Sequence, residues 1–207
     1  MAGLRERKKE QTRQRIAAVA LRLFAERGFD AVTVNEIAEA AEVSKATLFA
    51  YFPSKESLVL GGVAGDDLAA VAAARPPGQS FLAALRDYFR GLAAAGVPEA
   101  ELGALITRVR VITGSPVLRD AANALLYRQR RELARALAGS YGQPAAELIA
   151  AQVAASLLTL QETYFQRLLD GASPQEASRL LARDVELAFD LLEHGISQME
   201  TRRTGGE

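Results

Sequence analysis

The sequence of 207 residues contains no cysteine, so it forms no disulfide bond and offers no thiolate ligand to a metal ion. The absence of cysteine is compatible with a reducing compartment, and we expect a cytoplasmic location. Charged residues interrupt every apolar stretch, so none reaches the roughly 20 residues of a transmembrane helix. The N-terminus is basic, but the apolar segment of a signal peptide does not follow it. The sequence therefore predicts a protein without a membrane span.

Groups with catalytic chemistry are scarce as well. The one histidine, His194, falls near the C-terminal end of the last predicted helix, where a cation is ordinarily a partner of the helix dipole rather than a base. Asp66 and Asp67 are adjacent, and neighbouring side chains on a helix point about 100° apart, so the two carboxylates do not share a site. The sequence has no glycine-rich phosphate loop, metal-ligand cluster or nucleophile elbow. We therefore predict no enzyme activity, no catalytic residue, no metal and no cofactor.

The segment TVNEIAEAAEVSKATLFAYFPSK, residues 33–55, is the most informative part of the chain. Thr33 and Glu36 have the spacing of a capping box, which predicts a helix that starts after Thr33. Ser44 is a favourable N-cap for a second helix. The short turn between them places Glu42 in the left-handed conformation that glycine usually takes. Two short capped helices joined by such a turn are typical of a helix-turn-helix that binds DNA.

Only two residues of the second helix in this motif are needed for packing against the rest of the domain. Leu48 and Phe52, four residues apart, form its inward face. The side chains left to point outward or sideways are those of Lys45, Ala46, Thr47, Phe49 and Tyr51. Two aromatic side chains on an outer face are costly in water without a partner. Because residues at the start of a helix in the major groove reach base edges, we expect Lys45 and Thr47 to contact bases and Tyr51 to contact a phosphate.

The flanking segments complete a small helical domain. An apolar stripe predicts a helix over 13–27, which Gly28 ends in the left-handed conformation with Phe29 touching Phe24. Downstream, a helix opens with Lys55, and a lysine beside a helix N-terminus is a favourable phosphate site.

Charge is concentrated at the same end of the chain. The whole sequence has 25 basic and 25 acidic residues, whereas residues 1–22 hold seven basic and two acidic residues, a net charge of +5. A basic arm beside a helix-turn-helix is expected to bind phosphates or to enter a minor groove. The alternative is a solvated, frayed N-terminus, which the neighbouring motif makes the weaker interpretation.

These residues together resemble the TetR family of bacterial repressors. The matching positions are Ile16, Ala20, Leu23, Phe24, Gly28, Phe29, Thr33, Val34, Ile37, Ala38, Ala41, Val43, Ser44, Thr47, Leu48, Tyr51, Phe52, Ser54, Lys55, Glu56 and Leu58. The sequence departs from the family pattern at Glu42 and Ala46, where glycine is common, and at Phe49, where tyrosine is common. Phe49 cannot donate a hydrogen bond to phosphate, so we expect it to contact a thymine methyl or a sugar. The predicted DNA-binding residues are Thr33, Ser44, Lys45, Ala46, Thr47, Phe49, Tyr51 and Lys55.

Every later segment also has the pattern of a helix. The predicted helices cover residues 13–27, 34–41, 45–52, 55–74, 80–95, 98–112, 116–139, 142–169 and 174–199. This all-α arrangement matches the TetR-like architecture, which implies a three-helix DNA-binding domain, residues 1–53 with the basic N-terminal arm. It also implies a six-helix ligand-binding and dimerisation domain, residues 54–201. We expect residues 202–207 to form a disordered tail.

The last two predicted helices carry more apolar surface than one chain needs to bury. The helix over 142–169 is apolar on nearly all sides between Leu148 and Leu160. The last helix has two apolar stripes, one of Ala177, Leu181, Val185, Ala188 and Leu192, the other of Leu180, Leu187 and Leu191. We expect a homodimer through a four-helix bundle, with one thick monomeric core as the alternative. The predicted interface residues are Leu158, Leu181, Val185, Ala188 and Leu192.

The helix over 142–169 also has a polar face, formed by Gln152, Ser156, Thr159 and Thr163. Polar groups inside an apolar helix need partners, and they either line a ligand cavity or form hydrogen bonds across the dimer. Both interpretations stay open. The predicted ligand-binding residues are Tyr88, Phe89, Thr107, Arg108, Val111, Asn123, Tyr127, Ser156, Thr159 and Glu162. For each aromatic residue among them, taken singly, plain core packing is the favoured interpretation.

The sequence thus predicts a ligand-responsive transcriptional regulator. We expect a repressor that binds a palindromic operator in double-stranded DNA as a homodimer and is released by a small hydrophobic effector. The alternative is a helical small-molecule-binding or interaction protein without DNA binding. The pair Gly61–Gly62 lies inside the helix predicted over 55–74, where each glycine costs about 1 kcal/mol. It predicts a soft point that bends when effector binds, or else the close packing of a neighbouring helix.

Overall fold

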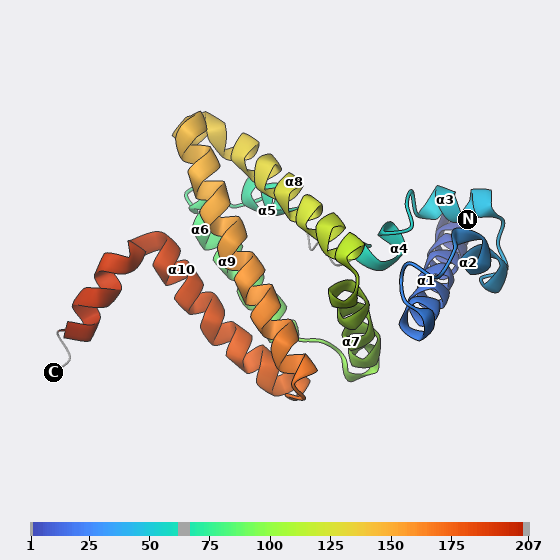
Figure 1. Ribbon diagram of the computed structural model, residues 1–207. Helices are drawn as coiled ribbons and strands as arrows, with labels where there is room; N and C mark the ends of the chain where they lie inside the picture. Colours follow the sequence, from blue (N-terminus) through green and yellow to red (C-terminus); the bar gives the residue numbers. More distant parts are fainter. Residues whose placement is uncertain (1, 62–66, 205–207) are drawn as a thin grey trace. The chain divides into compact units, whose positions relative to one another are not determined.

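The computed structural model describes residues 2–61 and 67–204, and every regular element in this part of the chain is an α-helix (Figure 1). The helices are α1 (Ala2–Arg27), α2 (Val34–Ala40), α3 (Lys45–Tyr51), α4 (Ser57–Leu60), α5 (Leu68–Ala73), α6 (Phe81–Ala95), α7 (Glu99–Gly114), α8 (Pro116–Tyr141), α9 (Gln143–Leu169) and α10 (Pro174–Thr204). The all-α prediction is confirmed. No helix among the described residues combines the length and the apolar character that crossing a membrane requires.

The chain forms two compact units. The first unit comprises residues 2–61 and 103–125, and the second comprises the described residues of 67–102 and 126–204. Residues 54–61 and 103–125 therefore pack with the helix-turn-helix. This division follows contacts within the chain, and the functional division at residues 53 and 54 stays a prediction.

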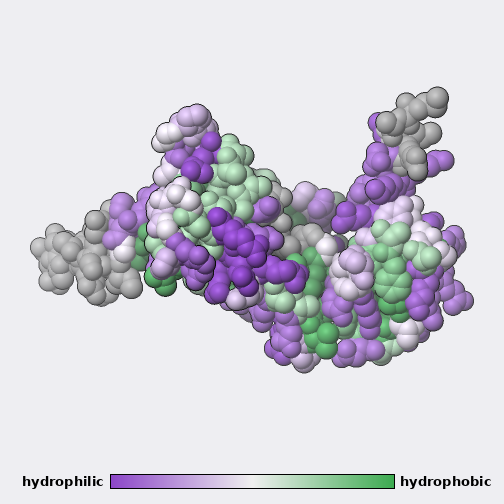
Figure 2. Space-filling model, turned by 90° about the horizontal axis from the view of Figure 1, so that it is seen from above, coloured by the Kyte–Doolittle hydropathy of each residue, from purple (hydrophilic) through white to green (hydrophobic). Residues whose placement is uncertain are grey.

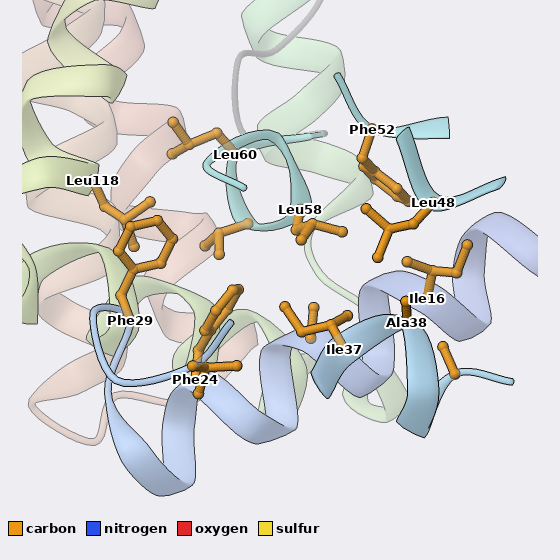
Figure 3. Packing of buried hydrophobic residues seen from close by; sticks show 14 residues of the cluster. Ile16, Phe24, Phe29, Ile37, Ala38, Leu48, Phe52, Leu58, Leu60 and Leu118 are labelled. Atoms are coloured by element: carbon orange, nitrogen blue, oxygen red, sulfur yellow. The ribbon is translucent and has the colours of Figure 1, made fainter. Parts of the chain in front are cut away.

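One apolar core holds the first unit together (Figure 3). Ile16 and Phe24 of α1, Ile37 of α2, Leu48 of α3 and Leu118 of α8 are each at most 1% exposed. Each such side chain stabilises the fold by roughly 1.5–3 kcal/mol relative to an exposed one. The core therefore fixes α3 against α1 and α2, and it leaves the opposite side of α3 exposed to solvent.

The predicted helix ends are present in the first unit. Gly28 ends α1 with φ +84°, and its N–H donates to the Phe24 carbonyl over 2.9 Å. The rings of Phe24 and Phe29 then meet with their centroids 5.0 Å apart, as the sequence predicted. Glu42 has φ +53°. The N–H groups of Glu42 and Val43 close a Schellman motif on α2, which offsets the cost of about 1–2 kcal/mol for a left-handed non-glycine residue.

Two predicted elements differ from the structure. The basic N-terminal segment is not an extended arm, because α1 begins at Ala2 and runs through it. Residues 4–10 are strong helix formers, and Gln14 donates to Glu10 one turn back. The predicted helix over 55–74 is two helices, because the chain leaves α4 at Gly61 with an extended ψ of 114° and Asp67 caps α5 afresh. Gly62, the second residue of the predicted hinge, lies outside the described residues.

In the second unit α6 and α9 each pack against α10, and Leu85, Val153 and Phe189 belong to their common apolar core. Salt bridges lie at the edge of this core. The Arg90 guanidinium binds the Glu186 carboxylate through two hydrogen bonds of 2.5 and 2.7 Å, and this pairing lowers the pKa of Glu186. Arg86, only 15% exposed, reaches Glu186, Asp190 and Glu193 at 3.7, 2.9 and 3.5 Å. These ion pairs fasten α6 to α10.

The C-terminal end of α10 is longer than predicted. Helix continues to Thr204, so residues 202–204 belong to α10 rather than to a disordered tail, and residues 205–207 lie outside the described part. At Gly195 the backbone turns to φ +71° and ψ 177°, which divides α10 into two segments. Glycine takes this conformation at little cost because it has no Cβ.

Candidate nucleic-acid interface

The exposed side of α3 is the centre of the candidate interface. Ser44 caps the helix by accepting the Thr47 N–H over 3.0 Å, and the two hydroxyls lie 2.8 Å apart. Lys45 and Ala46 are exposed, and Phe49 keeps 40% of its surface in solvent. Buried Leu48 fixes the opposite side of the helix. The first turn of α3 therefore presents one cation, small groups and one aromatic ring to a partner.

Tyr51 extends this surface toward the N-terminal half of α1. A shallow groove of about 470 Å³ is lined by Tyr51 and by Glu6, Lys8, Lys9 and Thr12. Two ammonium groups, a phenol and one carboxylate thus border one groove beside α3, so its net charge is +1. Such a set can bind a phosphate by charge and by hydrogen bonding. The individual lysines were not among our predicted site residues, although the net charge of the segment pointed to this end of the chain.

Thr33 serves α2 rather than presenting a free hydroxyl. Its backbone N–H and its hydroxyl both donate to the Glu36 carboxylate over 2.7 Å, and the Glu36 N–H donates back to its hydroxyl. Arg27 adds an ion pair of 2.8 Å to Glu36. These hydrogen bonds, first those from Thr33, lower the pKa of Glu36 from 4.5 to about 2. The predicted capping box is confirmed. It fixes the start of α2, which packs against α3.

The side chain of Lys55 points toward the interior of the first unit. Its ammonium donates to the Phe29 carbonyl over 2.5 Å and lies 4.2 Å from the centroid of the Phe29 ring and 5.7 Å from that of Phe24. A cation over aromatic rings is attracted by their negative faces. Lys55 therefore ties the residues before α4 to the end of α1. We expected a phosphate contact there because a lysine begins the segment, but the carbonyl and the rings occupy its ammonium.

The predicted ligand-binding residues are divided between the units. Thr107, Arg108, Val111 and Asn123 belong to the first unit and the others to the second. Thr107 and Val111 line a hollow of about 560 Å³ together with residues at the end of α1. In the second unit Phe89 packs on the core, whereas Thr159 and Glu162 are exposed. The ligand site therefore stays a prediction.

The predicted dimer stripe lies largely inside the chain. Val185 has no exposed surface, and Leu181, Ala188 and Leu192 pack against the same core. The assignment of Val185 to an interface is therefore wrong, because α6 and α9 already cover this side of α10. Leu158 is half-buried.

Other residues of α9 and α10 reach the surface. Leu148 and Leu187 are 66% and 48% exposed. From Leu148 onward the exposed residues of α9 recur at helical spacing and are Leu148, Gln152, Ala155, Thr159, Glu162 and Gln166. Hydrophobic patches also lie between hydrophilic ones on the face of the molecule in Figure 2. On the predicted polar face of α9, Gln152 and Thr159 are exposed, whereas Ser156 and Thr163 are half-buried, so both interpretations of this face stay predictions.

One group of side chains has the composition of a metal site. The ligand atoms of Asp190, Glu193 and His194 lie within 4.8 Å of one another near the break in α10. The Arg86 guanidinium forms ion pairs with Asp190 and Glu193. These two carboxylates therefore belong to the ion-pair cluster between α6 and α10.

Comparisons with known proteins identify the family of this chain. The model for bacterial regulatory proteins of the tetR family matches residues 16–61, and the model for the MftR C-terminal domain matches residues 79–197. The transcriptional regulator TcmR of Streptomyces glaucescens is 41% identical over 92 residues, which are 44% of this chain and 41% of TcmR. MftR of Mycobacterium tuberculosis, named as a transcriptional regulator of mycofactocin biosynthesis, is 28% identical over 93% of this chain and 95% of its own length.

Solved structures show the same architecture. A TetR-family regulator from Streptomyces coelicolor A3 is 26% identical and superimposes with a TM-score of 0.54 over 87% of this chain and 95% of its own. A TetR-family structure from Mesorhizobium loti, 18% identical, shares the fold with a TM-score of 0.52 over 88% of this chain and 95% of its own. The C-terminal model alone spans more than half of the chain, and the N-terminal model covers the capped helices α2 and α3. The chain therefore belongs to the TetR family of bacterial transcriptional regulators.

Proposed function

We propose that this regulator is a repressor that binds a palindromic operator in double-stranded DNA as a homodimer and is released by a small hydrophobic effector. The observation that carries the proposal is the exposed first turn of α3. The Ser44 cap and the buried side chain of Leu48 hold this turn in place. A helix held in this way enters a major groove with its N-terminal residues against base edges. Lys45 and Thr47 then contact bases, and Phe49 contacts a thymine methyl or a sugar.

Phosphate contacts come from the groove between α1 and α3. Lys8, Lys9 and Tyr51 line it, and their groups suit phosphate oxygens. Each phosphate neutralised by a lysine adds about 0.9 to the slope of log affinity against log salt. We do not include Lys55 among these contacts, because its ammonium binds the Phe29 carbonyl.

Assembly as a dimer uses the outward faces of α9 and α10. Leu148 and Leu187 supply exposed apolar surface, and Ala155 and Thr159 are small enough to allow close approach of a second α9. An isologous interface of this kind pairs two recognition helices, which on DNA lie about 34–36 Å apart, one helical turn. The effector acts by changing this separation. The coupling free energy between effector binding and operator binding is typically about 1–3 kcal/mol in such switches.

Operator binding tests the proposal. Genome-wide capture of DNA fragments by the purified protein identifies the operator, and fluorescence anisotropy then measures its affinity at several salt concentrations. We expect a palindromic site and an affinity that falls steeply with salt. Thr47→Ala is expected to relax the preference at one position in each half-site, and Lys45→Ala to weaken binding to the operator. The alternative function, a helical binding protein that does not bind DNA, is supported if no fragment is enriched.

A further inference from the structure

A polar hollow of about 520 Å³ lies in the second unit, between α8 and the first turns of α9. Its floor is formed by Ala134 and Ala138, which also pack against the apolar core of this unit. The two alanines are four residues apart on α8, so their small side chains leave space on one face of the helix. The hollow is thus a built depression over a packed core, away from the helix-turn-helix in sequence.

Three arginines line this hollow, Arg130, Arg131 and Arg135. None of them has an ion-pair partner in the described part of the chain, and one acidic residue, Glu147, lines the hollow with them. The lining therefore carries a net charge of +2. Guanidinium groups are planar and present paired donors, which match the oxygens of a phosphate or a carboxylate.

Two further features suit an organic anion. The Tyr127 ring lines the same hollow, is 52% exposed and lies 4.6 Å from the Arg130 guanidinium, so an aromatic surface stands beside the cations. Gln143, the first residue of α9, also lines the hollow. The positive end of a 27-residue helix adds to the attraction for a negative charge.

We propose that this hollow binds a small phosphate ester, with its phosphate groups on Arg131 and Arg135 and its organic part against Tyr127. An anionic ligand at this place is distinct from the hydrophobic effector proposed above, and its binding does not depend on DNA. The limited volume and the carboxylate of Glu147 favour a small anion over a continuous nucleic-acid backbone.

Isothermal titration of the full chain with pyrophosphate, adenosine diphosphate and adenosine, at constant ionic strength, tests the proposal. We expect both phosphate compounds to bind and adenosine not to bind. The double variant Arg131→Ala/Arg135→Ala is expected to weaken binding by about tenfold or more, since charge-assisted hydrogen bonds are lost. Arg128→Ala is the matched control, because Arg128 is exposed on the same helix but does not line the hollow.

Glu147→Gln provides a test in the opposite direction, because removing the one carboxylate is expected to tighten the binding of pyrophosphate. Thermal unfolding checks that the variants keep the fold. The proposal fails if neither phosphate compound binds, or if Arg128→Ala weakens binding as much as the double variant does. Operator binding by the double variant, expected to be unchanged, separates this result from a failure of the proposed repressor function.

Discussion

Replacement of Lys55 with methionine is expected to destabilise the first unit without changing the number of phosphate contacts. Methionine keeps an apolar stem of similar length but removes the ammonium that donates to the Phe29 carbonyl and lies over the Phe29 ring. A hydrogen bond from a charged donor contributes about 1.5–3 kcal/mol, and a cation over an aromatic ring about 0.5–2 kcal/mol. Because one ammonium makes both contacts, we expect a combined loss of about 2–3 kcal/mol.

For a chain of this size, 1 kcal/mol corresponds to about 2–4 °C in Tm, so Lys55→Met is expected to lower Tm by about 4–12 °C. Lys9→Met is the matched control, since Lys9 is exposed and lines the groove beside Tyr51. It is expected to leave Tm unchanged and to reduce the slope of log affinity against log salt by about 0.9. Calorimetry and anisotropy on both variants separate the roles. An unchanged Tm with a reduced salt slope in Lys55→Met would show that Lys55 binds phosphate and would refute our interpretation.

Three further predictions concern the cap, the dimer and the end of α4. The folded pKa of Glu36, about 2, lies below its ordinary 4.5. Its stabilising effect is therefore present above pH 4.5 and is lost as the pH falls toward 2; the Tm difference between wild type and Glu36→Gln should shrink over that range, and a constant difference would contradict the capping role. Leu187→Glu should yield folded monomers in sedimentation, whereas Val185→Glu, at a fully buried position, should unfold the second unit; a stable dimer of Leu187→Glu would exclude this interface. Gly61→Ala should lower Tm, because a Cβ at Gly61 would lie 2.8 Å from the Ser57 carbonyl oxygen; a higher Tm would instead indicate that α4 continues through residue 61 as helix.

Local signals in the sequence were sufficient for the helix-turn-helix. Thr33, Glu36 and Ser44 specify helix starts through hydrogen bonds that span three residues, and these bonds form in the structure. The left-handed conformations of Gly28 and Glu42 follow from helix ends in the same way. The all-α class and most helix bounds after residue 80 follow from apolar periodicity. Such features depend on neighbours within one or two turns, so the sequence displays them directly.

The sequence did not determine which contacts distant residues make. Lys55 begins a segment in the way a phosphate ligand would, but its ammonium meets Phe29, 26 residues away, because folding brings that carbonyl within reach. The two apolar stripes of α10 are similar in sequence, and only the packing of α6 and α9 decides that Val185 is buried while Leu187 stays exposed.

The sequence by itself therefore determined the helices, their caps and the exposed turn of α3, because these depend on local hydrogen bonds and periodicity. The tertiary structure alone decided the direction of Lys55, the buried side of α10 and the meeting of the α8 arginines with the start of α9 at one hollow, because these depend on which surfaces meet when the chain packs.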